Sequence, residues 1–214
     1  MKEINLDSWY RKDYFLFYRS FHTSLFNLSM DIDVTNAYNF CKKKNISFFI
    51  FCLYAFLRAC NKVPQFRYRL INEKIYDMEV LSASTPIMLP EDKNHQFTMV
   101  ECPYFDKLMD FVQHTQKLIE NPISGIAPDG KEQHTKGLVC LNCVPWFSFN
   151  GGAHAILEPH QTMPLINWGK FKIVNDKKIM PYFMQLNHMF IDGYHVGEFV
   201  KILENVFNEP KLYE

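Results

Sequence analysis

Alternating apolar and polar positions mark the extended segments of this chain. Between residues 23 and 33, apolar side chains recur at every second position: Phe26, Leu28, Met30 and Ile32. A strand that is buried on one side has this period, because successive side chains point to opposite faces of a sheet. The same reasoning predicts a hairpin within 66–89 and strands at 97–101, 137–149, 164–174 and 178–190. Pro145 should end or distort its strand, since proline has no N–H to donate.

Apolar residues spaced three and four apart mark the helical segments. This spacing predicts helices over residues 9–21, 34–44, 45–61, 104–119 and 194–207. The apolar run that ends before Arg58 falls short of the roughly 20 residues needed to cross a bilayer, so we expect a core helix. Residues 122–136 are polar and contain Pro128-Asp129-Gly130, which predicts a surface loop.

Strands and helices are mixed along the chain without the regular alternation of a doubly wound fold. This order predicts the α+β class, as a two-layer sandwich of a mixed β-sheet and packed helices. A length of 214 residues with 48% apolar residues fits a single domain over residues 1–214.

The charge balance narrows the possible partners and the location. The 23 Lys and Arg residues equal the 23 Asp and Glu residues, and the only basic run is the short one at 42–44. Nucleic acid is therefore not an expected partner, because its recognition depends on neutralising phosphates. Charged residues occupy the first turns of the chain, where a signal peptide would have an apolar core, so we expect a cytosolic protein with no membrane partner.

Cysteine and aromatic content add two expectations. The six cysteines should be reduced in the cytosol, and the Cys140-x-x-Cys143 pair lies in a strand where its members point to opposite faces. Packing of these thiols as small hydrophobic groups is favoured over zinc, which needs four ligands, so no metal is expected. The 20 Phe and 11 Tyr exceed what one core usually needs, which indicates an interface or a pocket.

One segment combines residue types that can carry out chemistry. The chain has no phosphate-binding glycine loop and no GxSxG motif, but His188 follows Tyr182, Met184 and Leu186 at the period of a strand. Asp192-Gly193 then forms a turn in which Asp192 can cap the last helix. A neutral imidazole held there can take a proton from a hydroxyl. The alternative is a core histidine bonded to the backbone, with Asp192 acting only as a cap.

The residues His188-x-x-x-Asp192-Gly193 and Tyr194-His195-Val196 resemble the HxxxDGxHV signature of chloramphenicol acetyltransferases. The resemblance extends to the N-terminal block from Trp9 to Arg19, which looks like that family's W-x-R-x-x-x-F-x-F-Y-R, and to Cys102-Pro103-Tyr104 and Pro145-Trp146. HxxxDG alone also marks dihydrolipoyl acyltransferases, which share the fold. Their catalytic domains usually follow a lipoyl domain and a linker, for which 214 residues leave no room.

The resemblance implies a homotrimer whose active sites lie between subunits and bind acetyl-CoA and a hydroxyl acceptor. It identifies His188 as the base that deprotonates the acceptor, and it pairs Asp192 with Arg11 in a structural ion pair. Tyr18 matches an acceptor-site tyrosine, which would face His188 of the next chain. Four residues match positions that face coenzyme A: Phe97, Trp146, Phe171 and Gln185.

Several positions depart from the family pattern. Asn142 stands where the family has the serine that binds the oxyanion, and an amide can still donate there. Asn187 replaces the first histidine of an HH pair, and Asn167 replaces a threonine near the acceptor. Gly152 and His154 stand where the family has Phe and Leu of the drug pocket.

These departures leave the acceptor open. The interpretation is a coenzyme A-dependent O-acetyltransferase with chloramphenicol as the default acceptor and His188 as base. One alternative is an acetyltransferase for a different hydroxylated acceptor, which is favoured by Gly152, His154, Asn142 and Asn167. The other is a trimeric binding protein of the same fold with little turnover.

Overall fold

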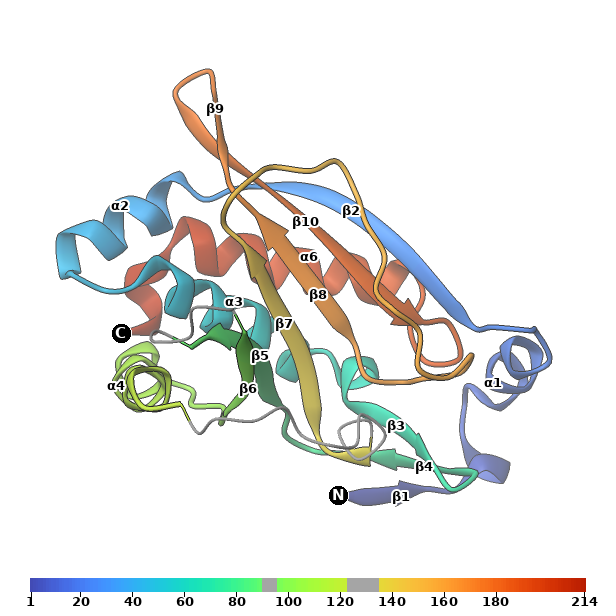
Figure 1. Cartoon of the computed structure of the whole chain (residues 1–214). Helices are drawn as coiled ribbons and strands as arrows, with labels where there is room; N and C mark the ends of the chain where they lie inside the picture. The colour runs from blue at the N-terminus through green and yellow to red at the C-terminus, as the bar shows by residue number, and fades with distance from the viewer. Residues whose placement is uncertain (90–95, 123–134) are drawn as a thin grey trace.

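The computed structural model describes residues 1–89, 96–122 and 135–214. One mixed sheet runs through the molecule in the strand order β2-β10-β8-β7-β5-β6, and β9 pairs with β10 beside this path (Figure 1). The strands are β2 (Leu25–Asp33), β10 (Lys177–Asn187), β8 (Leu165–Gly169), β7 (Leu138–Val144), β5 (Ser82–Met88), β6 (Phe97–Cys102) and β9 (Lys172–Val174). β7 is parallel to both β5 and β8, whereas the other pairs are antiparallel. The predicted mixed sheet is thus confirmed.

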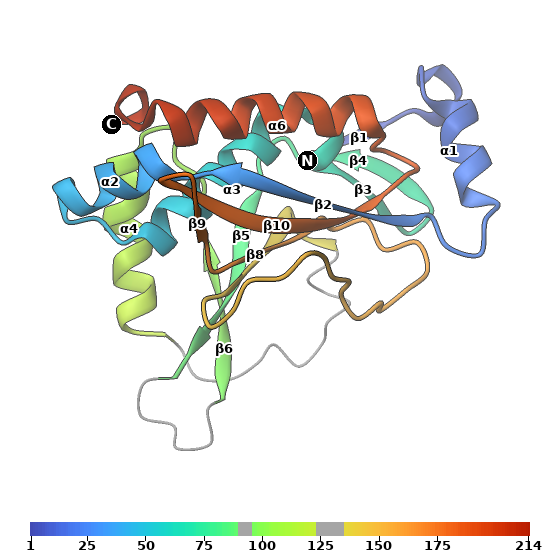
Figure 2. The same ribbon diagram turned by 90° about the horizontal axis from the view of Figure 1, so that it is seen from above.

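Helices cover one face of this sheet, which makes the predicted two layers (Figure 2). They are α2 (Thr35–Lys44), α3 (Phe48–Lys62), α4 (Leu108–Glu120) and α6 (Gly193–Asn208). The helix α1 (Lys12–Arg19) lies apart from them, at the end of the sheet where β2 begins and β10 ends (Figure 1). Short 3-10 turns occupy η1 (Leu6–Ser8), η2 (Pro64–Arg67) and η3 (Pro210–Tyr213).

The helix α3 is the centre of the core, as its continuous apolar sequence predicts. The Ser47 side chain accepts a hydrogen bond from the Ile50 N–H and so begins the helix. From Phe51 to Leu57 every side chain is fully buried, because α3 contacts α6 on one side and β5 and β7 on another. The Phe56 ring contacts Trp168 of β8 and Phe199 of α6. This side chain therefore packs α3 against both elements.

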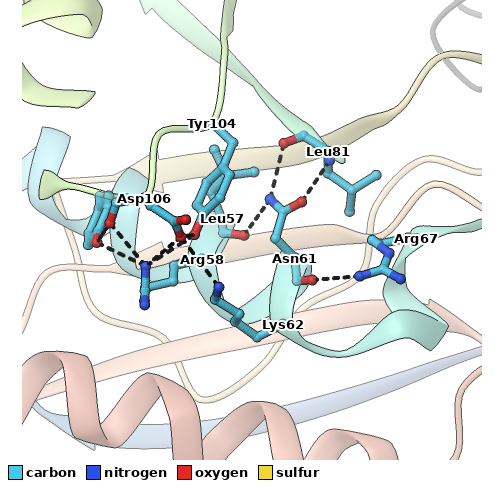
Figure 3. A network of polar contacts seen from close by, with 9 residues as sticks. Leu57, Arg58, Asn61, Lys62, Arg67, Leu81, Tyr104 and Asp106 are labelled. Atoms are coloured by element: carbon cyan, nitrogen blue, oxygen red, sulfur yellow. Dashed lines mark hydrogen bonds and ion pairs between the residues drawn. The ribbon is translucent and has the colours of Figure 1, made fainter. Parts of the chain in front are cut away.

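A polar network fixes the C-terminal half of α3 (Figure 3). The Asn61 amide donates to the Leu57 and Leu81 carbonyls at 3.0 and 3.1 Å and accepts the Leu81 N–H at 2.8 Å. Arg58 reaches the Tyr104 hydroxyl at 3.1 Å and the Asp106 carbonyl at 3.0 Å. Buried polar groups are stable when paired in this way, so the network joins α3 to the loops that precede β5 and α4.

A second, smaller sheet lies beside the large one, with β4 (Lys74–Asp77) between β1 (Lys2–Ile4) and β3 (Tyr68–Ile71). β3 and β4 form the predicted hairpin, and its turn residues Asn72 and Glu73 have φ of 49° and 63°. Positive φ at both central positions matches the right-handed twist of the strands.

Most predicted elements are confirmed, with three differences. The strand predicted at 137–149 ends at Val144, directly before Pro145, as the missing N–H requires. The strand predicted at 164–174 is two strands, β8 and β9, interrupted at Lys170 and Phe171. The strand predicted at 178–190 ends at Asn187, so His188 lies outside it. The loop predicted at 122–136 lies mostly outside the described residues.

Candidate active site

His188 lies one residue beyond the end of β10, not within the strand as the sequence pattern predicted. Its backbone N–H donates to the Ser24 carbonyl, which precedes β2, and not to a strand partner. Its ring lies between two aromatic rings of the same chain. The Tyr18 ring is stacked on it, with centroids 4.2 Å apart and planes 8° apart, and the Phe26 ring lies 4.4 Å away on a tilt of 32°.

The two ring nitrogens of His188 are in different surroundings. Nδ1 is buried and has no hydrogen-bond partner, whereas the residue as a whole is half-buried. Nε2 is not among the enclosed unpaired atoms, so its side of the ring is the more open one. A neutral imidazole with its proton on Nδ1 presents a lone pair at Nε2, which is the form a general base requires.

The predicted ion pair between Arg11 and Asp192 is present. Arg11 Nη1 donates to Asp192 Oδ2 at 2.9 Å, and the Arg11 side chain is only 6% exposed. Burial by itself raises the pKa of Asp192, but the hydrogen bond from Arg11 and the nearby positive charges outweigh it. The pKa of this carboxyl therefore lies below its ordinary value.

Sequence reasoning gave His195 no role, yet it completes this cluster. Asp192 Oδ1 lies 2.9 Å from His195 Nδ1, and the Asp192 N–H donates to the same nitrogen at 3.1 Å. The two residues form a reciprocal cap at the start of α6, and burial lowers the pKa of His195. The signal available in the sequence was the spacing, since His195 is three residues after the cap.

A second group of predicted residues lies on the sheet face away from the helices. In the strand register Asn142 of β7 is opposite Asn167 of β8, which is opposite Phe183 of β10. Directly opposite residues point to the same face, so the two asparagines and Phe183 share it. The segment that joins β7 to β8 covers this face and places His154 against Phe183, with ring centroids 5.4 Å apart.

His154 is held in this covering segment by a buried amide. Its backbone N–H donates to Gln185 Oε1 at 3.0 Å, and burial lowers the pKa of its imidazole, although the nearby Asn167 side-chain oxygen opposes this. Its Nε2 is buried, as are Asn167 Oδ1 and Gln185 Nε2, and none of the three has a hydrogen-bond partner of good geometry. The sheet face beneath the β7–β8 segment therefore has buried polar side chains whose hydrogen bonds are incomplete.

Gly152 explains one departure from the family pattern. A Cβ at this position would lie 2.5 Å from Cε1 of the Phe183 ring, closer than real Cβ atoms approach. A side chain at 152 therefore fits only if the Phe183 ring moves, because Phe183 fills the space that it would take.

The residues matched to coenzyme A-facing positions are in mixed surroundings. Phe97 and Trp146 are exposed, at 42% and 68%, and Phe171 packs partly against Tyr38 with ring centroids 5.1 Å apart. Gln185 differs from expectation, because it is only 2% exposed and its amide supports His154. We therefore correct its role to support of the covering segment. The other three positions stay predictions.

The predicted residues fall into two groups that a single chain does not bring together. Tyr18 was expected to face His188 of a neighbouring chain, and this was wrong, since the two rings stack within one chain. Asn167 lies opposite Phe183, and His188 is five residues further along, on the order of 16 Å at 3.2–3.4 Å per residue. The side chains of Asn142 and Asn167 are thus remote from His188 of the same chain.

A cavity of about 500 Å³ includes His160 in its lining but not His188. Arg19, Glu73 and His160 are among its described lining residues, and neither His188 nor Asp192 is one of them. Within the described ranges no three His, Cys, Asp or Glu side chains gather to hold a metal ion. No helix in those ranges is long and apolar enough to span a membrane.

Solved structures share this fold and define the class. A structure described as a chloramphenicol acetyltransferase is similar with a TM-score of 0.88 and 28% identity, covering 96% of this chain and 98% of that one. A dihydrolipoamide acetyltransferase of Azotobacter vinelandii is similar in fold alone, with a TM-score of 0.64 and 13% identity over 89% of this chain and 84% of that one. The fold is thus that of the coenzyme A-dependent acyltransferases.

Sequence comparison identifies the family. The family model described as chloramphenicol acetyltransferase matches residues 1–204. A chloramphenicol acetyltransferase of Bacillus pumilus is 26% identical, covering 94% of this chain and 91% of the relative. Chloramphenicol acetyltransferase 2 of Escherichia coli is also 26% identical, covering 94% of both chains. The chain belongs to the chloramphenicol acetyltransferase family.

Proposed function

We propose that this chain transfers an acetyl group from acetyl-CoA to a hydroxyl of chloramphenicol or a similar small molecule. The observation that carries the proposal is the placement of His188, whose ring is held between Tyr18 and Phe26 with its Nε2 side accessible. Membership of the family supplies the reaction class.

His188 acts as the general base in a ternary complex. Its Nε2 accepts the proton of the acceptor hydroxyl while the hydroxyl oxygen attacks the thioester carbonyl. The resulting oxyanion needs a donor, for which the Asn142 amide is the candidate on the outer sheet face. When the intermediate collapses, the C–S bond breaks and His188 returns its proton to the leaving thiolate. The Arg11–Asp192 pair orients the turn that carries His188 and moves no proton.

The separation of His188 from Asn142 supports a shared site in a homotrimer. His188 and Asn142 do not meet within one chain, so an outer sheet face of one chain has to meet the His188 end of another. Exposed aromatic residues around α1 support this, among them Tyr10, Tyr14 and Phe17 at 67%, 59% and 57% exposure. Soluble monomers rarely expose such a patch. A cytosolic location remains a prediction from the sequence.

A second candidate is transfer to a more polar hydroxylated acceptor. His154, Asn167 and Gln185 give the outer face a polar floor with unpaired buried atoms. These atoms are already buried and unpaired in the free protein, so an apolar group gains nothing from them. An acceptor with matching polar groups that reaches them would recover about 1–3 kcal/mol for each donor or acceptor it pairs.

Thiol release from acetyl-CoA over a panel of hydroxylated acceptors that includes chloramphenicol tests the proposal. His188→Ala should lose about 10²–10⁴-fold in rate, because general-base catalysis contributes this much. His195→Ala should lose far less, and His114→Ala, an exposed histidine on α4, should lose nothing. Binding of both substrates without thiol release would instead favour the binding-protein alternative. Full turnover by His188→Ala would overturn the assignment of the base.

A further inference from the structure

A closed ring of hydrogen bonds surrounds the backbone of His188. The His188 N–H donates to the Ser24 carbonyl at 2.8 Å, and Ser24 Oγ lies 2.9 Å from His160 Nδ1. The His160 carbonyl accepts from Asn187 Nδ2 at 3.2 Å, and Asn187 precedes His188 in the chain. The ring therefore joins the end of β10, the start of β2 and the segment before β8.

Asn187 makes the most side-chain hydrogen bonds of the three residues in this ring. It is only 3% exposed, and its Nδ2 also donates to the Gln161 carbonyl at 2.9 Å. Its Oδ1 accepts the Met189 N–H at 2.9 Å, which bends the chain immediately after His188. Every hydrogen-bonding atom of this side chain thus restrains the backbone on either side of His188.

His188 needs such a restraint from outside the sheet. It lies beyond the last ladder residue of β10, and its Nδ1 makes no hydrogen bond that would orient the ring. The Tyr18 and Phe26 faces limit tilting of the imidazole but not sliding in its own plane. A misplacement of about 1 Å in a reacting group can cost on the order of 10²-fold in rate.

We propose that Asn187, Ser24 and His160 are positioning residues that fix His188 in the geometry needed for proton transfer. The proposal rests on the proposed function of His188 as base. None of the three residues touches a reacting atom, so they act through the backbone of His188.

The contacts of Asn187 can be separated by one substitution. Asn187→Asp keeps the acceptor for the Met189 N–H but places a carboxylate oxygen against the His160 and Gln161 carbonyls, where the amide donated. We expect kcat to fall by roughly 10–100-fold with little change in either KM, because substrate contacts remain while the base moves. Asn36→Leu is the matched control, since the Asn36 amide also donates to a carbonyl, that of Asn208, but on α2.

Ser24 and His160 provide a test that does not disturb the β10 turn. Ser24→Ala and His160→Ala each remove the same Oγ–Nδ1 contact, so each should lower kcat several-fold and the double variant should lower it no further. Restoring the hydroxyl with Ser24→Thr should recover most of the activity. Fully multiplicative losses in the double variant, or unchanged kcat in Asn187→Asp and in both single variants, would overturn the proposal.

A readout independent of turnover separates this proposal from the proposed function. The His188 ring proton resonance, assigned by its loss in His188→Ala, should shift in Asn187→Asp and Ser24→Ala but not in Asn36→Leu. If the wild-type protein releases no thiol and the resonance still shifts, the proposed function fails while the positioning role stands. If the protein is active and the resonance stays in place in both variants, the positioning role fails alone.

Discussion

Removal of the Asp192 carboxylate tests how the site is held together. Asp192→Ala would leave the Arg11 guanidinium, with a side chain only 6% exposed, without its anion. Its Nε and Nη2 already lack hydrogen-bond partners, and the Tyr14 ring, with its centroid 5.3 Å from Cζ, offers only a weaker cation–π contact in place of the anion. Breaking a buried pair costs about 3–5 kcal/mol, and since the Asp192 side chain is 34% exposed and water can enter, we expect about 2–3 kcal/mol here.

The same geometry predicts an asymmetry between the two partners. Arg11→Met leaves Asp192 with solvent and with His195, so this change should cost less, about 1–2 kcal/mol. Asp192→Asn keeps an acceptor for Arg11 Nη1 and should lie between Asp192→Ala and the parent. Each Asp192 variant should also lower kcat, because the turn that carries His188 is less well fixed.

Urea unfolding measures these differences, with all variants at one protomer concentration because the stability of an oligomer depends on it. Glu198→Gln is the control, since the Glu198–Lys201 pair is comparably short, at 2.7 Å against 2.9 Å for Arg11–Asp192, but is exposed, and its loss should cost less than about 1 kcal/mol. A larger loss from Arg11→Met than from Asp192→Ala, or no loss from either, would refute the reasoning.

Three further predictions follow from the packing and the charges. Phe56→Ala should cost about 3–5 kcal/mol in urea unfolding, whereas the exposed Phe147→Ala should change stability by less than about 0.5 kcal/mol. Tyr18→Leu should lower kcat more than Tyr18→Phe does, since only the latter keeps the ring on His188. Burial lowers the pKa of His154, His160 and His195, so the unfolded state binds more protons and stability should fall as pH drops below about 6.5. A flat stability between pH 7.5 and 5.5 would contradict the last prediction.

The sequence predicted the elements well because their patterns are local. The alternation in β2 requires a strand that is covered on one side, and the apolar run of α3 requires a helix that is buried all round. The structure has both. The end of β10 was misplaced because the apolar period continues through Phe190, which is buried although it lies outside the strand. The period of apolar residues indicates which side chains are buried but not which backbone groups pair with a neighbouring strand. It therefore cannot locate the last residue of the strand.

The site was predicted less completely, for a different reason. Arg11 and Asp192 are 181 positions apart, and only a resemblance could pair them before the fold was known. The ring of bonds through Ser24, His160 and Asn187 has no sequence pattern, because two of its links use backbone carbonyls that every residue has. Likewise nothing in the spacing shows that Gln185 is buried under His154.

The two faces of β10 have different tasks, which limits how the acceptor preference of this protein can change during evolution. Its inward side chains, Tyr182, Met184 and Leu186, pack in the core, while Phe183 and Gln185 support the outer face and the next residues carry the base. A substitution on β10 therefore alters stability, acceptor contacts and the base together. The part of the β7–β8 segment around His154 carries neither core helices nor the contacts of His160 and Gln161 that hold the His188 backbone, so new acceptor preferences can accumulate there at little cost to folding. We expect natural variants with altered acceptors to differ in that segment first, and β10 to change late.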